Sequence, residues 1–170
     1  MSLNSEVITG LPEGDEETKS ETFIYIKQKI NNTVWKISRK AASGSKFLKA
    51  SILENPNAST YGTVVNPLII DMEYDTMPFI IRYLEHFVDK PDIPIPEKPL
   101  KNVDISVILG NNYKLFIGIY NDDDALGVKF EKLNTYIMSA VYFNIKNLHE
   151  VICAIVASLV KNKTIEELSV

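Results

Sequence analysis

Two histidines, one cysteine and a run of three aspartates are the residues of this sequence whose chemistry could support catalysis or metal binding. His86 and His149 lie on separate predicted helices, so they cannot form the i, i+4 pair with which a helix binds zinc, and no HExxH motif is present. Cys153 interrupts an apolar helical run with no cation beside it to activate the thiol. This setting favours an inert buried cysteine over a nucleophile.

The run Asp122, Asp123 and Asp124 also lacks the spacing that its chemistry would need. Calcium loops place their ligands at alternating positions around a glycine bend, and neither feature occurs here. We interpret the run as an exposed acidic turn before a helix. The sequence contains no GxSxG, no phosphate-binding glycine loop and no dinucleotide fingerprint. It therefore predicts no enzyme, no bound metal and no cofactor.

Composition narrows the remaining function classes. The chain has 170 residues with 45% hydrophobic and 24% charged content, which is enough for one globular core. A net charge of −4 without a basic block disfavours nucleic-acid binding, and the apolar runs are too short to span a membrane. No secretory signal is apparent, and a single cysteine excludes an intrachain disulfide. A reducing compartment is expected, so we predict cytoplasm and nucleus.

The first half of the chain predicts a small sheet with helices behind an acidic, disordered tail. The sheet begins as a hairpin around Asn31 and Asn32. A later helix begins at Asp75 or Thr76, with Pro78 in its first turn, where proline is tolerated. The predicted elements are, in order, a tail at 1–21, strands at 22–28 and 33–37, a helix at 41–53 entered near Ser43 or Ser45, a strand at 68–70, and the helix that stops before Pro91.

The second half opens with a connector that holds four prolines, followed by segments of strand-like sequence. Prolines restrict a chain to extended conformations, so 89–101 is predicted to be a surface linker. Runs at 103–110 and 113–120 predict a second hairpin around Asn111 and Asn112, which would cover or extend the first sheet. A helix at 130–143 is expected next, with these residues facing inward: Phe130, Leu133, Ile137, Met138 and Val141.

The last predicted helix, 147–161, carries the strongest apolar pattern of the chain. Seven residues at helical spacing fall on one stripe, and these are Leu148, Val151, Ile152, Ile155, Val156, Leu159 and Val160. Polar or small residues, among them Ala154 and Ser158, fall mostly off the stripe. Such a helix must pack on something, in this chain or in a partner.

The stretch VYFNIKNLHEVICAIVASLVKNKTIEEL resembles the helix-turn-helix near the end of the S-phase kinase-associated (Skp) adaptor family of SCF, or cullin-based, ubiquitin ligases. The family pattern there is A-N-Y-L-D-I-K-G-L-L-D, an apolar helix, and K-G-K-T-P-E-E-I. Residues that agree in register are Tyr142, Ile145, Lys146, Leu148, Val151, Cys153, Val156, Ala157, Lys161, Lys163, Thr164, Glu166 and Glu167. The block IIRYLEHFVDKP is similar to V-I-E-Y-C-E-H-H-K-D-D-P at Ile81, Tyr83, Glu85, His86, Asp89 and Pro91.

The resemblance implies a BTB/POZ-type α/β (α+β) fold, a small sheet flanked by helices, with a C-terminal helical extension. It implies a domain at 22–145 with an insertion around 92–129, then a truncated helical region at 146–170. It also implies a non-catalytic adaptor that bridges a cullin to F-box substrate receptors in ubiquitin-dependent degradation. The implied cullin-facing residues are Val141 and Tyr142, and the implied F-box-facing residues are Val151, Ile155, Leu159, Ile165 and Leu168.

The sequence departs from the family at several points. Tyr120 and Asn121 stand nearest to the family's Trp-Asp anchor, Ile165 replaces the proline of K-T-P-E-E, and the family continues through further helices beyond Val170. An elongin C-like adaptor is a close alternative, although the helix at 147–161 favours the Skp side. A self-associating BTB scaffold, which forms a homodimer through an exposed helical surface, is a third hypothesis.

Overall fold

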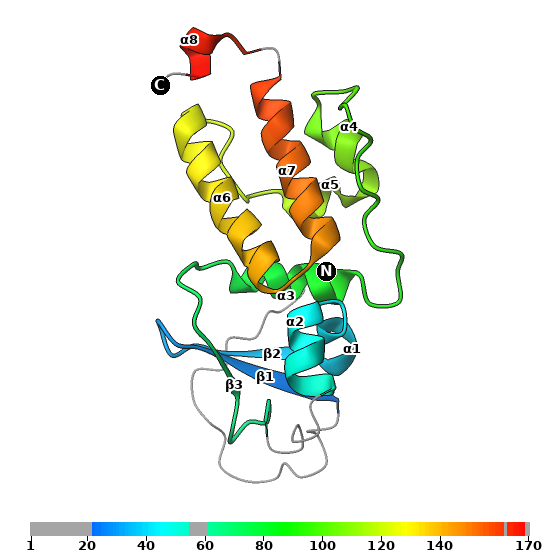
Figure 1. Cartoon of the computed structure of the whole chain (residues 1–170), viewed down its shortest axis with the longest axis vertical. Coiled ribbons are helices and arrows are strands. Elements are labelled where there is room, and N and C mark those ends of the chain that lie inside the picture. The colour runs from blue at the N-terminus through cyan, green and yellow to red at the C-terminus, as the bar shows by residue number, and fades with distance from the viewer. Residues whose placement is uncertain (1–21, 55–60, 162, 169–170) are drawn as a thin grey trace. The chain divides into compact units, whose positions relative to one another are not determined.

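The computed structural model describes residues 22–54, 61–161 and 163–168. The chain divides into two compact units, 1–90 and 91–170, and each is described by itself (Figure 1). The predicted tail at 1–21 lies outside the described residues. Among the described helices, none combines the length and the apolar character that a bilayer crossing requires.

The first unit is built on a three-stranded sheet of order β2-β1-β3. Strand β1 (Phe23–Gln28) pairs antiparallel with β2 (Val34–Ser38) and parallel with β3 (Leu68–Ile70), which confirms the predicted strands. The turn depends on its two asparagines. Asn32 adopts a φ of 55°, and the Asn31 side chain accepts a hydrogen bond of 2.9 Å from the Thr33 N–H. Both features suit asparagine, which tolerates the left-handed region and mimics a backbone turn.

Four helical segments accompany this sheet. They are α1 (Arg39–Ala42), α2 (Lys46–Leu48), the π-helical η1 (Lys49–Leu53) and α3 (Met77–His86). The helix predicted at 41–53 is therefore interrupted, and the Ser45 hydroxyl caps its second part by accepting from the Leu48 N–H at 3.1 Å. At the interruption, a Cβ on Gly44 would lie 3.0 Å from the end of the Leu84 side chain of α3 and 3.2 Å from the Ala41 carbonyl, so the chain packs closely around this glycine. Thr76 directly precedes α3. The sequence predicts that this helix begins at Asp75 or Thr76, and the structure agrees with Thr76.

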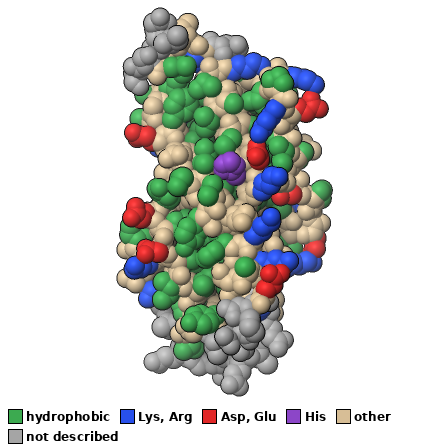
Figure 2. Space-filling view, in the orientation of Figure 1, with side chains coloured by type: hydrophobic (Ala, Val, Ile, Leu, Met, Phe, Trp, Pro, Cys, Tyr) green, Lys and Arg blue, Asp and Glu red, His purple; other side chains and the backbone are tan. Residues whose placement is uncertain are grey.

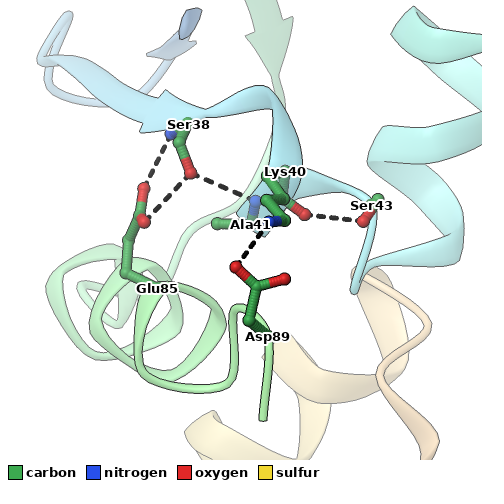
Figure 3. Close-up of polar contacts among 6 residues, drawn as sticks. All are labelled: Ser38, Lys40, Ala41, Ser43, Glu85 and Asp89. Carbon is green, nitrogen blue, oxygen red and sulfur yellow. Dashed lines mark hydrogen bonds and ion pairs between the residues drawn. The ribbon is translucent and has the colours of Figure 1, made fainter. Parts of the chain in front are cut away.

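A carboxylate on α3 joins this helix to the end of β2 (Figure 3). One Glu85 oxygen accepts from the Ser38 N–H at 2.7 Å and the other accepts from the Ser38 hydroxyl at 3.0 Å. The same hydroxyl accepts from the Ala41 N–H at 3.1 Å and caps α1. Lys40 and Asp89 form an ion pair beside this contact. Two residues of the resembling block, Glu85 and Asp89, thus have a structural role within the first unit.

We expect Glu85→Ala to lower the free energy of unfolding of this unit by about 1–3 kcal/mol, because it removes two charge-assisted hydrogen bonds and leaves the Ser38 N–H without its acceptor. Urea titration followed by the fluorescence of Trp35, the one tryptophan of the sequence, measures the change. Glu73→Ala is the matched control, since Glu73 is exposed in the same unit. Equal losses in the two variants would contradict the assigned role of Glu85.

In the second unit, all regular secondary structure of the described residues is helical. An extended connector leads from Pro91 to α4 (Ile105–Leu109), followed by the 3-10 turn η2 (Gly110–Asn112) and α5 (Tyr113–Phe116). Two longer helices, α6 (Leu126–Tyr142) and α7 (Lys146–Val160), pack against each other, and a short α8 (Ile165–Leu168) follows. The predicted linker and the two long helices are confirmed.

The strands predicted at 103–110 and 113–120 are wrong, because residues 105–116 form α4, η2 and α5 and residues 117–120 form turns and bends. Local polar contacts select the helical form. The Asp104 carboxylate accepts from the Ser106 N–H at 2.8 Å and caps α4, while Gly110 ends it with a φ of 53°. No second hairpin joins the sheet among the described residues, which form a mixed α/β structure with one small sheet.

The predicted inward face of α6 is only partly correct. Leu133 is fully buried and Phe130 and Ile137 are half-buried, but Met138 and Val141 are exposed. Ser139 and Ala140 are buried in their place. The Ser139 hydroxyl donates to the Thr135 carbonyl at 2.7 Å within its own helix. A serine satisfied in this way can be buried, and a hydropathy pattern does not anticipate it.

The apolar stripe of α7 is confirmed for its first four members. Leu148, Val151, Ile152 and Ile155 are fully buried, whereas Val156, Leu159 and Val160 are half-buried. Ala154 and Ser158, predicted to lie off the stripe, are also buried. Helix α7 therefore has a second covered face.

Candidate partner-binding site

The turn between α6 and α7 is a Schellman motif that fixes the last residues of α6. Asn144 adopts a φ of 51°, its N–H donates to the Val141 carbonyl at 3.0 Å, and the Ile145 N–H donates to the Ala140 carbonyl at 2.9 Å. Ile145 is buried next to this turn. The two hydrogen bonds satisfy carbonyls that a helix end otherwise leaves unpaired. The exposed end of α6 is consequently held in one conformation.

We expect Asn144→Val to destabilise the second unit by about 1–2 kcal/mol, because a β-branched side chain is strained at positive φ. Asn144→Gly should be neutral or stabilising, since glycine adopts this conformation without a Cβ clash. Urea unfolding followed by far-UV circular dichroism gives both values. Asn134→Val is the matched control at an exposed position inside α6. The Schellman assignment fails if Asn144→Gly is as destabilising as Asn144→Val.

The two implied cullin-facing residues lie on the last turn of α6. The Val141 side chain is 55% exposed. Tyr142 is half-buried, and its ring meets the buried Phe143 ring edge-on with centroids 5.3 Å apart. Figure 2 shows hydrophobic side chains gathered over the α6–α7 pair. An exposed aliphatic side chain beside a fixed aromatic ring is a suitable contact surface for another protein.

The five implied F-box-facing residues are not equally placed. Val151 and Ile155 are fully buried, and Leu159 is half-buried on the same helix. Leu168 on α8 is 42% exposed, and the side chain of Ile165 lies outside the described residues. Among the four members whose side chains the structure describes, Leu168 is exposed and Leu159 is partly exposed.

Helix α8 begins with a capping box made by two residues of the resembling motif. The Glu167 carboxylate accepts from the Thr164 N–H at 2.9 Å, and the Thr164 hydroxyl accepts from the Glu167 N–H at 3.3 Å. The backbone hydrogen bond from Thr164, together with Lys163, holds the pKa of Glu167 below its usual range. The threonine and second glutamate of K-T-x-E-E therefore start the helix that presents Leu168.

The proline-rich connector is bound to one side of α7. Asn147 donates from its side-chain amide to the Ile93 carbonyl at 3.2 Å, and Lys161 donates to the Leu100 carbonyl at 2.6 Å. Between them, Lys98 pairs with Glu150 at 2.7 Å. The hydrogen bond from Lys98 holds the pKa of Glu150 below its ordinary value. Ala154 and Ser158 are buried on the same side of α7.

Cys153 and His149 form an i, i+4 pair that the sequence interpretation missed. The Cys153 Sγ lies 3.7 Å from the His149 Nε2, and the cysteine is half-buried rather than buried. Burial raises the pKa of the Cys153 thiol, so the neutral form predominates at neutral pH. Within the part of the chain that the structure describes, no three His, Cys, Asp or Glu residues are grouped to hold a metal ion.

The three aspartates form the expected turn before α6. Asp124 accepts from the Asn121 N–H at 3.2 Å and pairs with Lys132 at 2.6 Å. The hydrogen bond from Lys132 is the main reason that the pKa of Asp124 is lowered. Lys129 donates to the Asp122 carbonyl at 2.7 Å. The Asp124 carboxylate and the Asp122 carbonyl therefore tie the turn to α6.

Together, the mixed α/β fold and the exposed apolar end of the α6–α7 pair define a protein whose candidate site is a surface for another protein. Comparison with protein-family models finds no match. Among curated proteins, the chain is 30% identical over 140 residues to the S-phase kinase-associated protein 1 homolog of Tetrahymena thermophila. The alignment covers 82% of this chain and 75% of that relative. The chain belongs to the S-phase kinase-associated protein 1 family.

Proposed function

We propose that this chain is a non-catalytic adaptor of an SCF-type ubiquitin ligase, which binds a cullin with one surface and an F-box substrate receptor with another. The observation that carries the proposal is the 30% identity to the S-phase kinase-associated protein 1 homolog across 82% of the chain. The small sheet with its accompanying helices is consistent with a BTB/POZ domain as the finer fold. Cytoplasm and nucleus are the compartments in which such an adaptor would act.

The proposed cullin surface is the last turn of α6. The Schellman turn at Asn144 fixes this segment before any partner binds, which lowers the entropy cost of association. Val141 supplies exposed apolar area, and Tyr142 supplies a ring already packed on Phe143. Aromatic residues held in this way are frequent energetic centres of interfaces.

The proposed receptor surface lies along α7 and α8. Leu168 and the half-buried Leu159 are available in this conformation. Val151 and Ile155 belong to the same proposed surface but are covered within the chain. Their participation in receptor binding requires that some neighbouring element move.

We expect Tyr142→Lys to weaken cullin binding at least about tenfold, because a lysine cannot replace the ring contact and places a charge in an apolar interface. Calorimetry with a purified cullin N-terminal domain gives the affinity, and circular dichroism checks that the variant remains folded. Val128→Lys, at an exposed position near the other end of α6, is the matched control. An unchanged affinity in Tyr142→Lys would argue against this face. If the parent chain binds neither the cullin nor an F-box domain, the adaptor proposal is wrong.

Light scattering distinguishes the homodimer hypothesis from the adaptor proposal. Exposed Met138 and Val141 on α6 give such an association an apolar surface to use. A scaffold requires a stable dimer at micromolar concentration, whereas the adaptor requires a monomer that binds cullin.

A further inference from the structure

A stretch of the connector, residues 93–100, lies along the whole length of α7, and we name it the strap. Its first carbonyl, on Ile93, is bound by Asn147 at the start of α7, and its last, on Leu100, is bound by Lys161 just after the helix. Because the two ends of the strap are bound in the same order as the two ends of the helix, the strap and α7 run in the same direction (Figure 1).

The side of α7 that faces the strap is suited to a close-lying extended chain. Asn147, Glu150, Ala154, Ser158 and Lys161 follow one another at steps of three or four, so they form one stripe of the helix. Polar side chains bind the strap at both ends of this stripe, and two small residues lie between them. Small side chains let an extended backbone approach the helix closely. Ala154 is 8% exposed and Ser158 is 6% exposed, which shows that the stripe is covered.

The strap itself is held by few contacts. Ile93 is the buried side chain of the strap, Pro96 and Leu100 are half-buried, and the remaining strap residues are exposed. The ion pair that joins the strap to α7, from Lys98 to Glu150, uses a lysine side chain that is 71% exposed. Segments with little buried apolar area and solvent-exposed polar contacts open at low free energy. Helix α6, by contrast, is joined to α7 by the short Schellman turn and packs on it extensively.

Val151 connects the strap to the proposed receptor surface. It lies four residues after Asn147 and three before Ala154, so it adjoins the covered stripe, and it is fully buried. We propose that the strap is a removable autoinhibitory cover of α7, and that an F-box receptor reaches this side of the helix only when the strap lifts. The inference rests on the proposed function, because it names the regulation of the proposed receptor surface.

A thiol placed under the strap measures its opening directly. In a Cys153→Ser background, Ser158→Cys carries a thiol at a buried position of the stripe that the strap is proposed to cover, and Ile152→Cys carries one at a buried position of α7 outside that stripe. Labelling with a thiol reagent under native conditions then separates opening of the strap from unfolding of the helix pair. Lys98→Glu breaks the ion pair and opposes Glu150, while Lys114→Glu makes the same charge change at an exposed site outside the strap.

We expect Lys98→Glu to raise the labelling rate at position 158 by about threefold to fivefold, in line with the loss of one exposed ion pair, and to leave the rate at 152 unchanged. The affinity for a purified F-box domain should rise by a similar factor, because a partner of the open state gains in proportion to its population. Ile93→Ser, which removes the buried anchor, should act more strongly, and Lys114→Glu should have no effect.

Each other outcome overturns the inference in a distinguishable way. If neither Lys98→Glu nor Ile93→Ser raises labelling at position 158, the strap is not removable. If labelling rises but F-box affinity is unchanged or lower, the strap does not compete with the receptor, and the adaptor proposal still stands. If no variant and no parent chain binds an F-box domain, the proposed function fails and the autoinhibitory role fails with it, whatever the labelling rates show.

Discussion

Ile155→Ala is expected to lower the free energy of unfolding of the second unit by about 2–5 kcal/mol, the range for truncating a fully buried aliphatic side chain. Ile155 is 0% exposed in α7. Its removal would forfeit the transfer free energy of three carbon atoms and leave a cavity between packed helices that relax only in part. Most natural domains have only about 5–15 kcal/mol of stability, so this loss would be a large share of the total.

The matched control is Ile117→Ala, which makes the same truncation where the isoleucine is 58% exposed. Its effect should remain within about 0.5 kcal/mol, as for most surface substitutions. Urea unfolding followed by the far-UV circular dichroism of the helices compares the two variants. A loss below about 1 kcal/mol in Ile155→Ala would mean that this side chain faces outward. A large loss in the free energy of unfolding would mean that any weaker F-box binding by this variant is caused mainly by its lower stability, and only secondarily by a lost contact with the receptor.

Gln28→Leu is expected to destabilise the first unit by about 2–5 kcal/mol, because one buried and one partly buried carbonyl would lose their partner at about 1–3 kcal/mol each. The Gln28 side chain is fully buried at the end of β1, and its amide nitrogen donates to the carbonyls of Met72 and Tyr74, both at 3.0 Å. Leucine has a similar size but no donor. Urea titration followed by Trp35 fluorescence measures the loss.

Gln28→Glu tests the same contact through pH. A carboxylate would face two carbonyl oxygens in a buried site, so we expect a folded-state pKa above the unfolded value of about 4.3. The protonated acid keeps one hydrogen bond, and the variant should therefore be most stable below that unfolded value. Its stability relative to the parent should fall as the pH rises toward neutrality, because the folded state then resists losing the proton. A stability difference that does not change between about pH 4 and about pH 7 would contradict the proposed geometry around Gln28.

Much of the first unit could be predicted because its signals are local. The alternation in β1 and the two asparagines of the turn determine the hairpin, and the pairing of β1 with β2 follows from them. The burial of Gln28 also has a local signal, because Gln28 shares one face of β1 with Ile24 and Ile26, which are both fully buried. A polar residue on the apolar face of a strand indicates a buried side chain that needs partners. The partners themselves lie on a distant segment, and no local pattern identifies them.

The segment at 103–120 shows where sequence patterns are ambiguous. Short apolar runs suit a strand or a buried helical turn equally well, and periodicity alone cannot decide between them. The Asp104 cap and the positive φ of Gly110 select the helix. Asp104 was visible in the sequence, but its capping role depends on the conformation that it helps to form.

The sequence by itself determined the class of fold, the helices α6 and α7, and the family, because these depend on periodicity and on residues that agree in register. Only the tertiary structure decided which side chains of that helix pair are available. It exposes Val141, buries Val151, Ile155, Ala154 and Ser158, and ties the strap to α7 through Asn147 and Lys161. The physical reason is that the segment tied to α7 comes from a distant part of the chain, with Ile93 lying 54 residues before its partner Asn147. A periodic pattern shows which face of a helix is apolar, but the long-range contacts determine what covers each face.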